Sequence, residues 1–447
     1  MRKYLIIIFT MIISNSLFAE KKLTLDEAVS IALQRNSNLI KTSNSIEINR
    51  SQVKSAYGDL LPDFGLTGRW GWSKYDDERN SQIIQGQEFQ TGTVSNEFRT
   101  YSLSAGGGIT LFNGLANYKR IGQTEDELDA AEYNLEKVKQ DIVLNTIDLY
   151  YGVLKAKSLL KVREDNLEFN KKLFETIDER NRLGVIPIAD VYTQQVQLGN
   201  AQLAVIQAEN AYQNIVSNFL DFLALDVLEE YEFENPFGNI DDPDYDDLMN
   251  DFSDLGSMVQ EALANRYDYK GQKAAVSGAE KGVGISYGGL FPILTGTYGF
   301  STSVNKTSDL FDQRTWNLGL TLNLPIFSNW NTETQIQIAK VQEKNAYEDL
   351  SALERLIKIE VKQGYLNLAA SKKALEVSNK NVKAAGENRR VNTERYNLGS
   401  GTILDVLQAD KDYTDALNNK IESTYQFLID YDDLKNRLGK LDYQKYE

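Results

Sequence analysis

The 447-residue chain contains no His and no Cys, and this limits the chemistry that its side chains could perform. Without imidazole there is no Ser-His-Asp triad, and without imidazole or thiolate there is no typical ligand set for zinc, copper or haem. Catalysis would have to rely on carboxylates, Lys, Tyr or Ser alone. We therefore expect no enzymatic activity, no cofactor and no metal site. The net charge of −16 also argues against a nucleic-acid partner.

Among the carboxylates, one run has a spacing like the start of a calcium loop: Asp242, Asp244 and Asp246. An EF-hand loop requires Gly at its sixth position and Glu at its twelfth, and here Asp247 and Ser253 occupy those positions. The surrounding segment 226–254 holds twelve acids and no Lys or Arg, so we interpret it as a solvated acidic linker.

Two matching nine-residue turns are more informative, LGVIPIADV at 183–191 and LGSGTILDV at 398–406. Their glycines, Gly184 and Gly399, suit a left-handed residue that ends a helix. Asp190 and Asp405 then fall at the start of the returning helix, where unpaired N–H groups favour a carboxylate. Helix capping alone would explain both acids, and a ring of charges in an oligomer is the alternative.

These turns belong to a tandem repeat. Residues between 25 and 62 recur 230 positions later, and residues between 103 and 191 recur 215 positions later. Each copy reads short helix, helix, strand, loop, strand, very long helix, turn, long helix. The predicted ranges are 20–225 for the first repeat, 255–439 for the second and 440–447 for a tail.

Each repeat contains two strands in which apolar residues alternate with small polar ones. They are predicted at about 63–73 and 100–112, and at about 293–302 and 315–327. This alternation is typical of an outer-membrane strand, apolar to lipid and polar to the lumen, although a soluble sandwich is the alternative. The polar segment 74–98 is predicted to be an external loop.

The helices follow the strands, at about 113–183 and 188–225, and again at about 329–398 and 404–438. Apolar residues recur every seven positions along them, for example Val191, Leu198 and Val205, which predicts coiled-coil packing. At the amino terminus, Arg2 and Lys3 precede an apolar run and Ala19 follows it. This pattern predicts a secretory signal peptide over residues 1–19, with an uncleaved anchor as the alternative.

Four strands cannot close a barrel, and lipid does not tolerate open sheet edges. A dimer would give eight strands and a trimer twelve. An eight-stranded barrel is filled by its own side chains, and the small inward residues of these strands favour the wider trimer.

Taken together, four features resemble the TolC family of outer-membrane efflux ducts. They are the signal peptide, the tandem repeat, the strand pairs between long heptad helices, and the L-G-x5-D-V turn in both copies. The resemblance implies a mixed α and β membrane protein, a homotrimer whose 12-stranded transmembrane β-barrel is continued across the periplasm by a coiled-coil α-barrel. It also implies the function, a passive exit duct of a tripartite efflux or type I secretion system in the outer membrane lipid. The implied partners are a periplasmic adaptor and an inner-membrane pump of RND or ABC type. A structural or adhesive coiled-coil surface protein without transport is the alternative.

The resemblance further assigns roles to the turns. Asp405 would line the pore constriction, with Gln408 in place of the family's second acid, and Asp190 with Tyr396 would form a gate lock. The family's other lock pair falls on Gly401 and Ala189 and is therefore absent, so we expect a less tightly held closed state. The residues implied to contact the adaptor are Gly184, Val185, Ile186, Pro187, Gly399, Ser400, Gly401 and Thr402.

Overall fold

The computed structural model describes residues 21–77, 82–84, 87–89, 94–236, 252 and 254–446. The predicted signal peptide and the acidic run around Asp244 lie outside these residues. The chain forms two compact units, which we describe separately. We call them the sheet unit (Ser43–Asn134 and Asp268–Leu353) and the helical unit (Met1–Thr42, Leu135–Tyr267 and Glu354–Glu447).

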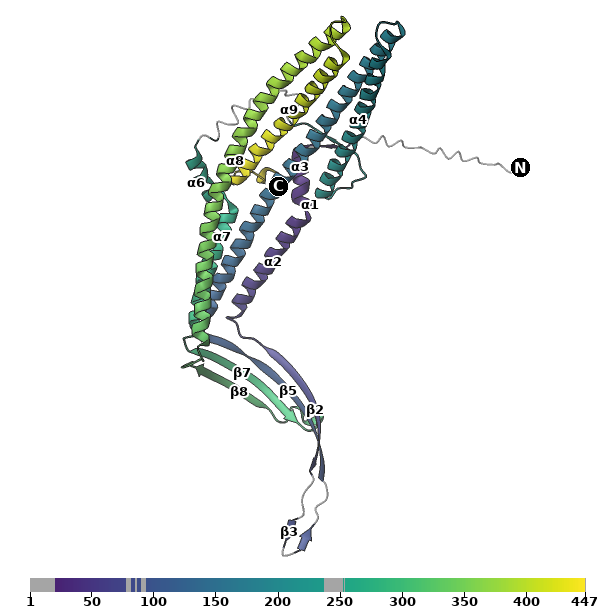
Figure 1. Cartoon of the computed structure of the whole chain (residues 1–447). Helices are drawn as coiled ribbons and strands as arrows, with labels where there is room; N and C mark the ends of the chain where they lie inside the picture. Colours follow the sequence, from purple (N-terminus) through teal and green to yellow (C-terminus); the bar gives the residue numbers. More distant parts are fainter. Residues whose placement is uncertain are drawn as a thin grey trace, which may run out of the picture. The chain divides into compact units, whose positions relative to one another are not determined.

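The sheet unit is built on one antiparallel four-stranded sheet with the order β2-β5-β7-β8 (Figure 1). Its strands are β2 (Gly65–Asp77), β5 (Val94–Asn113), β7 (Ile293–Val304) and β8 (Thr315–Asn323). Between β2 and β5 lies a short hairpin of β3 (Gln82–Ile84) and β4 (Gln87–Phe89). The short helix η1 (Thr307–Asp309) follows β7. The segment 74–98, predicted to be a loop, is therefore strand at both ends, because β2 continues to Asp77 and β5 begins at Val94.

The register of the sheet gives it one apolar and one small polar face. Rows of residues that lie opposite one another across all four strands are Leu66, Ala105, Phe300 and Trp316 on one face, and Gly65, Gly106, Gly299 and Asn317 on the other. The apolar face is open in this single chain, since Trp316, Leu318 and Leu320 are each more than 70% exposed. The alternation predicted from the sequence is confirmed. A register shift between Thr110 and Phe112 is the one irregularity along β5, and it brings Phe112 opposite Leu294.

Three consecutive glycines of β5 allow the chain that precedes β2 to lie directly on the sheet. The Asp63 N–H donates to the carbonyl of Gly108 at 2.9 Å, and the N–H of Gly108 donates to the Asp63 carboxylate. A Cβ on Gly107 would lie only 1.9 Å from the carbonyl oxygen of Asp63. Only glycine therefore fits at position 107, because a Cβ there would overlap the Asp63 carbonyl.

The helical unit contains the C-terminal parts of two long helices and the whole of the two shorter helices that follow them in the chain. The long helices are α3 (Ala116–Arg182) and α8 (Asn331–Asn397), 67 residues each, and the returning ones are α4 (Ile188–Phe222) and α9 (Ile403–Arg437), 35 residues each. Figure 1 shows α3 running beside α4 and α8 beside α9. The equal lengths confirm the tandem repeat. In the part of the chain that the structure describes, no helix has the length and hydropathy required to cross a membrane.

The remaining elements are short. Helices α1 (Leu25–Arg35) and α2 (Ser37–Gly58) open the first repeat, and α6 (Leu255–Asn265) and α7 (Tyr267–Gly288) open the second. Strands β1 (Lys21–Leu23) and β6 (Tyr231–Phe233) pair in parallel, so a strand lies inside the segment predicted to be an acidic linker. The tail contains the short helix η2 (Gln444–Tyr446).

Tyr150 of α3 holds the β1–β6 pair against the helices. Its side chain is fully buried, and its hydroxyl lies 2.9 Å from the carbonyl oxygen of Leu23 and 2.6 Å from that of Glu234. Its ring packs edge-on against Phe219 and Phe233, with centroids 5.9 and 6.0 Å away. Because a buried hydroxyl is costly without partners, these backbone carbonyls account for the position of Tyr150.

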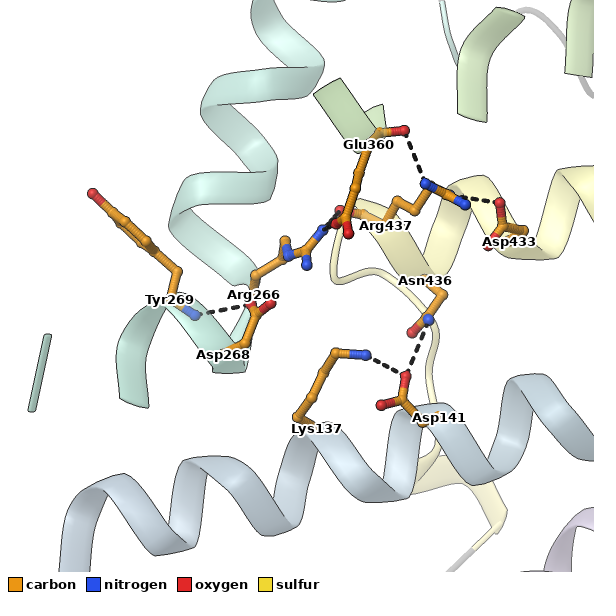
Figure 2. Close-up of polar contacts among 9 residues, drawn as sticks. All are labelled: Lys137, Asp141, Arg266, Asp268, Tyr269, Glu360, Asp433, Asn436 and Arg437. Carbon is orange, nitrogen blue, oxygen red and sulfur yellow. Dashed lines mark hydrogen bonds and ion pairs between the residues drawn. The ribbon is translucent and has the colours of Figure 1, made fainter. Parts of the chain in front are cut away.

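A buried arginine attaches α6 to the helices of the second repeat (Figure 2). Arg266 is 6% exposed, and its Nη1 donates to Glu360 Oε2 of α8 at 2.6 Å. Arg437 of α9 completes the cluster by donating to the Glu360 carbonyl at 3.2 Å and to Asp433 Oδ2 at 2.6 Å. The buried Arg266 and the half-buried Arg437 thus both have anionic or carbonyl partners, as burial of charge requires.

We predict that Gly107→Ala destabilises the protein, because its Cβ would meet backbone that cannot move aside. The expected loss is about 1–3 kcal/mol of unfolding free energy, the usual cost of overpacking. Thermal unfolding followed by circular dichroism would measure it as a lower Tm. Gly68→Ala is the matched control, since Gly68 lies on the same face of the sheet and a Cβ there meets nothing within 4 Å. Equal melting temperatures for the two variants would contradict the close approach of Asp63.

Candidate functional site at the two helix turns

The two turns at the ends of α3 and α8 have the same backbone geometry. Gly184 and Gly399 both have φ of +74°, in the left-handed region that favours glycine. The N–H of Gly184 donates to Asn181 O at 2.8 Å and that of Val185 to Arg180 O at 2.9 Å. The second turn repeats this pair of bonds at the equivalent residues, with distances of 3.0 and 2.8 Å. Both turns are therefore Schellman motifs, as the matching sequences predict.

The helices that follow these turns begin in different ways. Helix α9 starts with a capping box, in which the Asp405 N–H donates to Thr402 Oγ1 at 3.2 Å and the Thr402 N–H donates to Asp405 Oδ2 at 3.0 Å. Helix α4 begins at Ile188, and the N-cap residue before it, Pro187, provides no side-chain cap. Asp190 is thus free of the capping role that Asp405 fills, although the two acids are equivalent in the repeat.

Asp405 is exposed and ionised at neutral pH. The hydrogen bonds from Thr402 hold the pKa of its carboxyl below the usual range. Gln408 is exposed as well and lies one turn farther along α9, where its Nε2 donates to Asp412 Oδ1 at 2.7 Å. Residues three apart share a helix face, so the two predicted constriction residues are exposed on the same side of α9.

Asp190 and Tyr396, the predicted gate lock, meet in one hollow. This hollow has a volume of about 500 Å³ and lies between the two turns, where Arg180 and Thr402 also line it. Tyr396 is only 5% exposed, and its hydroxyl has no hydrogen-bond partner. Burial raises the pKa of Tyr396, and the negative charge of Asp190 raises it further. The structure therefore brings the two residues of the predicted lock together in one hollow.

Arg180 connects the two turns, and this contact was not predicted from the sequence. Its guanidinium lies 5.5 Å from the centre of the Tyr396 ring, and it donates to the carbonyl oxygens of Tyr396 and Asn397 at 3.5 and 3.3 Å. A cation is favoured at these carbonyls because they carry the negative end of the α8 dipole. The repeat mate Arg395 instead donates within its own turn, to Ser400 O at 3.4 Å.

An apolar core lies directly behind the turns and joins all four helices. Its buried members are Leu173, Ile177, Val191, Tyr396, Ile403 and Val406. Five large apolar residues in the two turns or at the start of α4 and α9 are exposed instead. They are Leu183, Val185, Ile188, Leu398 and Leu404. The predicted adaptor-contacting segments, 184–187 and 399–402, therefore lie on an accessible surface with an apolar rim. No cluster of three acidic residues suited to a metal is found among the residues that the structure describes.

We predict that Arg180→Met loosens the junction of the two turns, whereas Tyr396→Phe does not. Removal of the charged donor should lower stability by about 1 kcal/mol, the usual net value of such hydrogen bonds. Removal of a buried hydroxyl without a partner should leave the Tm unchanged or raise it slightly. Thermal unfolding of the two variants and the parent would test this. A clear fall in Tm for Tyr396→Phe would indicate that the Asp190–Tyr396 pair is hydrogen-bonded in solution.

Comparison with known proteins identifies this architecture. The family model described as "Outer membrane efflux protein" matches residues 28–221 and 258–440. The outer membrane protein TolC of Vibrio cholerae serotype O1 is 21% identical over 443 residues, covering 97% of this chain and 93% of its own. TolC of Escherichia coli K12 is 21% identical over 431 residues, with 92% and 80% covered.

Solved structures agree with the sequence relatives. The CmeC outer membrane channel of Campylobacter jejuni superposes with a TM-score of 0.78 over 94% of this chain and 88% of its own, at 16% identity. The outer membrane protein VceC of Vibrio cholerae superposes with a TM-score of 0.75 over 93% and 96%, also at 16% identity. The chain thus has the fold of these channels, in which a β-barrel is joined to a long helical barrel. It belongs to the outer membrane efflux protein family, resides in the outer membrane and extends its helical domain into the periplasm.

Proposed function

We propose that this chain is the exit duct of a tripartite efflux or type I secretion system, a passive conduit across the outer membrane and periplasm. The observation that carries the proposal is the sheet. It has one open apolar face, one face of small polar residues, and two edge strands, β2 and β8, that pair on one side only. Such a sheet is suited to lipid on one face and to water on the other, provided that its edges are completed.

Completion of the edges requires further copies of the chain, and we propose three. Two copies would supply eight strands, which leave an interior just wide enough for side chains. Three copies supply twelve strands. The inward residues of the proposed barrel are mostly Gly, Ser, Thr and Asn, with Arg69 of β2 among the exceptions, and their small volume leaves room for a water-filled lumen.

The long helices support the same assembly. In α4 the exposed apolar residues Tyr192, Val196, Leu203 and Ile206 follow one side of the helix and are 58–65% exposed. Helix α8 carries a similar exposed stripe, made of Leu356, Ile359, Leu366 and Val377. Exposed apolar stripes of this length on a helix indicate a surface that packs against another helix or protein. We propose that they pack against helices of the neighbouring copies, as continuation of the sheet from copy to copy demands.

The partners follow from the passive role that we propose. A passive duct needs a pump, which we infer to be an inner-membrane protein of the RND or ABC type, and an adaptor that bridges the two. We propose that the adaptor contacts the turn segments 184–187 and 399–402, whose apolar rim is exposed in the single chain.

We propose that the turns also form the gate. In a trimer, the exposed Asp405 and Gln408 of each chain would surround the axis at the periplasmic end. Three carboxylates around a narrow aqueous opening repel one another and attract cations. The capping bonds from Thr402 offset part of this repulsion. Arg180, which lies against the Tyr396 ring and donates to carbonyls at the end of α8, would hold the two turns of each chain together in the closed state, with Asp190 beside Tyr396 in the same hollow.

We predict that the purified protein is a trimer that conducts ions. Native mass spectrometry in detergent should give three chains, since twelve strands close the proposed barrel. The same sample should form channels in a planar lipid bilayer. A trimer without conductance would favour a structural or adhesive coiled-coil protein, and a conducting monomer would contradict the proposed architecture.

We also predict that Asp405→Ala leaves the trimer folded but weakens its cation preference and its block by divalent ions. Reversal potentials and block curves in planar bilayers would measure both effects. Asp254→Ala is the matched control, because Asp254 caps α6 through the N–H of Ser257 and lies outside the turns. If Asp405→Ala lowers the Tm but leaves selectivity and block as in the parent, Asp405 is a helix cap and no more.

A further inference from the structure

A buried polar cluster lies next to the apolar core of the turns and takes side chains from all four helices. Its members are Asn166 and Asn170 of α3, Gln194 of α4, Arg389 of α8, and Asp410 and Thr414 of α9. All of them belong to the helical unit. We call this group the Asp410 cluster.

Asp410 is the centre of this cluster and is only 4% exposed. Its Oδ1 accepts a hydrogen bond from Arg389 Nη1 at 3.1 Å, within the α8–α9 pair. Its Oδ2 accepts from Asn166 at 2.8 Å and from Asn170 at 3.2 Å, both on the other helix pair. One carboxylate therefore connects the two helical hairpins of the chain.

The surrounding residues reinforce this connection. Asn166 also donates to Thr414 Oγ1 at 3.1 Å, and Gln194 donates to Asn170 Oδ1 at 3.0 Å. The guanidinium of Arg389 lies 4.0 Å from the ring centre of Tyr413 and 4.8 Å from that of Phe169. Arg389 thus contacts both hairpins, like the carboxylate that it pairs with.

The tandem repeat does not account for the Asp410 cluster. At the offset of 215 residues, Asp410 corresponds to Gln195, which is exposed, and Gln194 corresponds to Ala409. Asn166 does have an asparagine mate, Asn381, but that residue is exposed as well. The cluster is therefore a feature of one arrangement of the two hairpins and is absent from the fold of each repeat alone.

A buried polar cluster of this kind contributes to structural specificity more than to stability. Burial of a charge pair is expensive, and apolar residues of similar volume often give equal or greater stability. A polar group in an apolar seam does, however, fix register, because its partners exist in only one alignment. The neighbouring core is formed by Ile177, Val191 and Val406, whose side chains could slide past one another with little penalty.

We propose that the Asp410 cluster fixes the register between the two hairpins and thereby positions Asp405 and Gln408 at the end of the duct. Asp410 is five residues beyond Asp405, about 7.5 Å along the same helix. A shift of α9 against α3 would therefore move the proposed constriction by the same amount. Asp410 is a positioning residue, and the part of the inference that concerns conduction rests on the proposed function.

The absence of cysteine from the chain allows a direct test. Leu183 and Leu398 are exposed residues of the two turns, so Leu183→Cys and Leu398→Cys can carry spin labels. Coproduction with an excess of unlabelled chain would restrict the measured distance by pulsed EPR to the two turns of one chain. The decisive variant is the apolar triple Asn170→Leu, Arg389→Met and Asp410→Leu.

We expect the triple variant to remain folded and yet to lose the single distance of the parent. Additional distances should appear, because a slide of α9 against α3 by one helical turn, about 5 Å, displaces Leu398 relative to Leu183. Conductance in planar bilayers should rise by about tenfold, the effect of ~1.4 kcal/mol on a two-state equilibrium. Gln195→Leu with Asn381→Leu is the matched control, and it should match the parent in distance and conductance.

A narrow, unshifted distance in a folded triple variant would overturn the proposal. If that variant does not fold, Asn170→Ser removes one bond to Asp410 and keeps the Arg389 pair, and it should broaden the distance less but in the same way. A broadened distance without conductance in any sample, parent included, would support the register role and contradict the proposed duct. A conducting parent with unchanged distances in both variants would retain the duct and reject the register role.

Discussion

The unpaired backbone groups along β2 and β8 are the constraint on which the rest of this structure depends. In hydrocarbon each unsatisfied N–H or C=O costs several kcal/mol, so a four-stranded sheet with free edges is not stable in a membrane by itself. In the assembly that we propose, other copies continue the sheet, and the long helices that leave the same strands follow the same ring. This requirement gives a physical reason for apolar residues on the outer sides of α4 and α8, where the single chain has nothing to cover them.

The two turns combine an identical backbone with different side-chain contacts. Both end in a glycine with φ of +74° and the same pair of backbone hydrogen bonds. Of the two returning helices, α9 has a capping box and α4 does not, and of the two equivalent arginines, Arg180 reaches the opposite turn whereas Arg395 stays within its own. The backbone geometry of the turns is repeated, whereas their side-chain contacts are not. Asp405 is bound to its own helix, while Asp190 remains available in the hollow beside Tyr396.

Much of this fold can be predicted from the sequence, because strand alternation and heptads are periodic. Each pattern also occurs twice, once in each repeat. The β1–β6 pair has no such signal, since three residues show no period. Burial is also not repeated: Tyr150 is fully buried, whereas its repeat mate Tyr365 is only half-buried. In the same way, the sequence cannot tell that Arg180 crosses to the other turn while Arg395 does not, or that Asp410 meets Asn166. These contacts depend on how two unlike hairpins pack, and their partners are about 215 to 245 residues apart.

The shared geometry of the turns bears on the stoichiometry of the assembly. In the proposed trimer, six helical hairpins would alternate around the ring, three ending at Gly184 and three at Gly399. A partner that recognises only backbone shape would meet six equivalent positions. A partner that recognises the side chains around Thr402, or those around Pro187, would meet three. The number of adaptor molecules bound per duct would therefore show whether the adaptor recognises the main chain of the turns or their side chains.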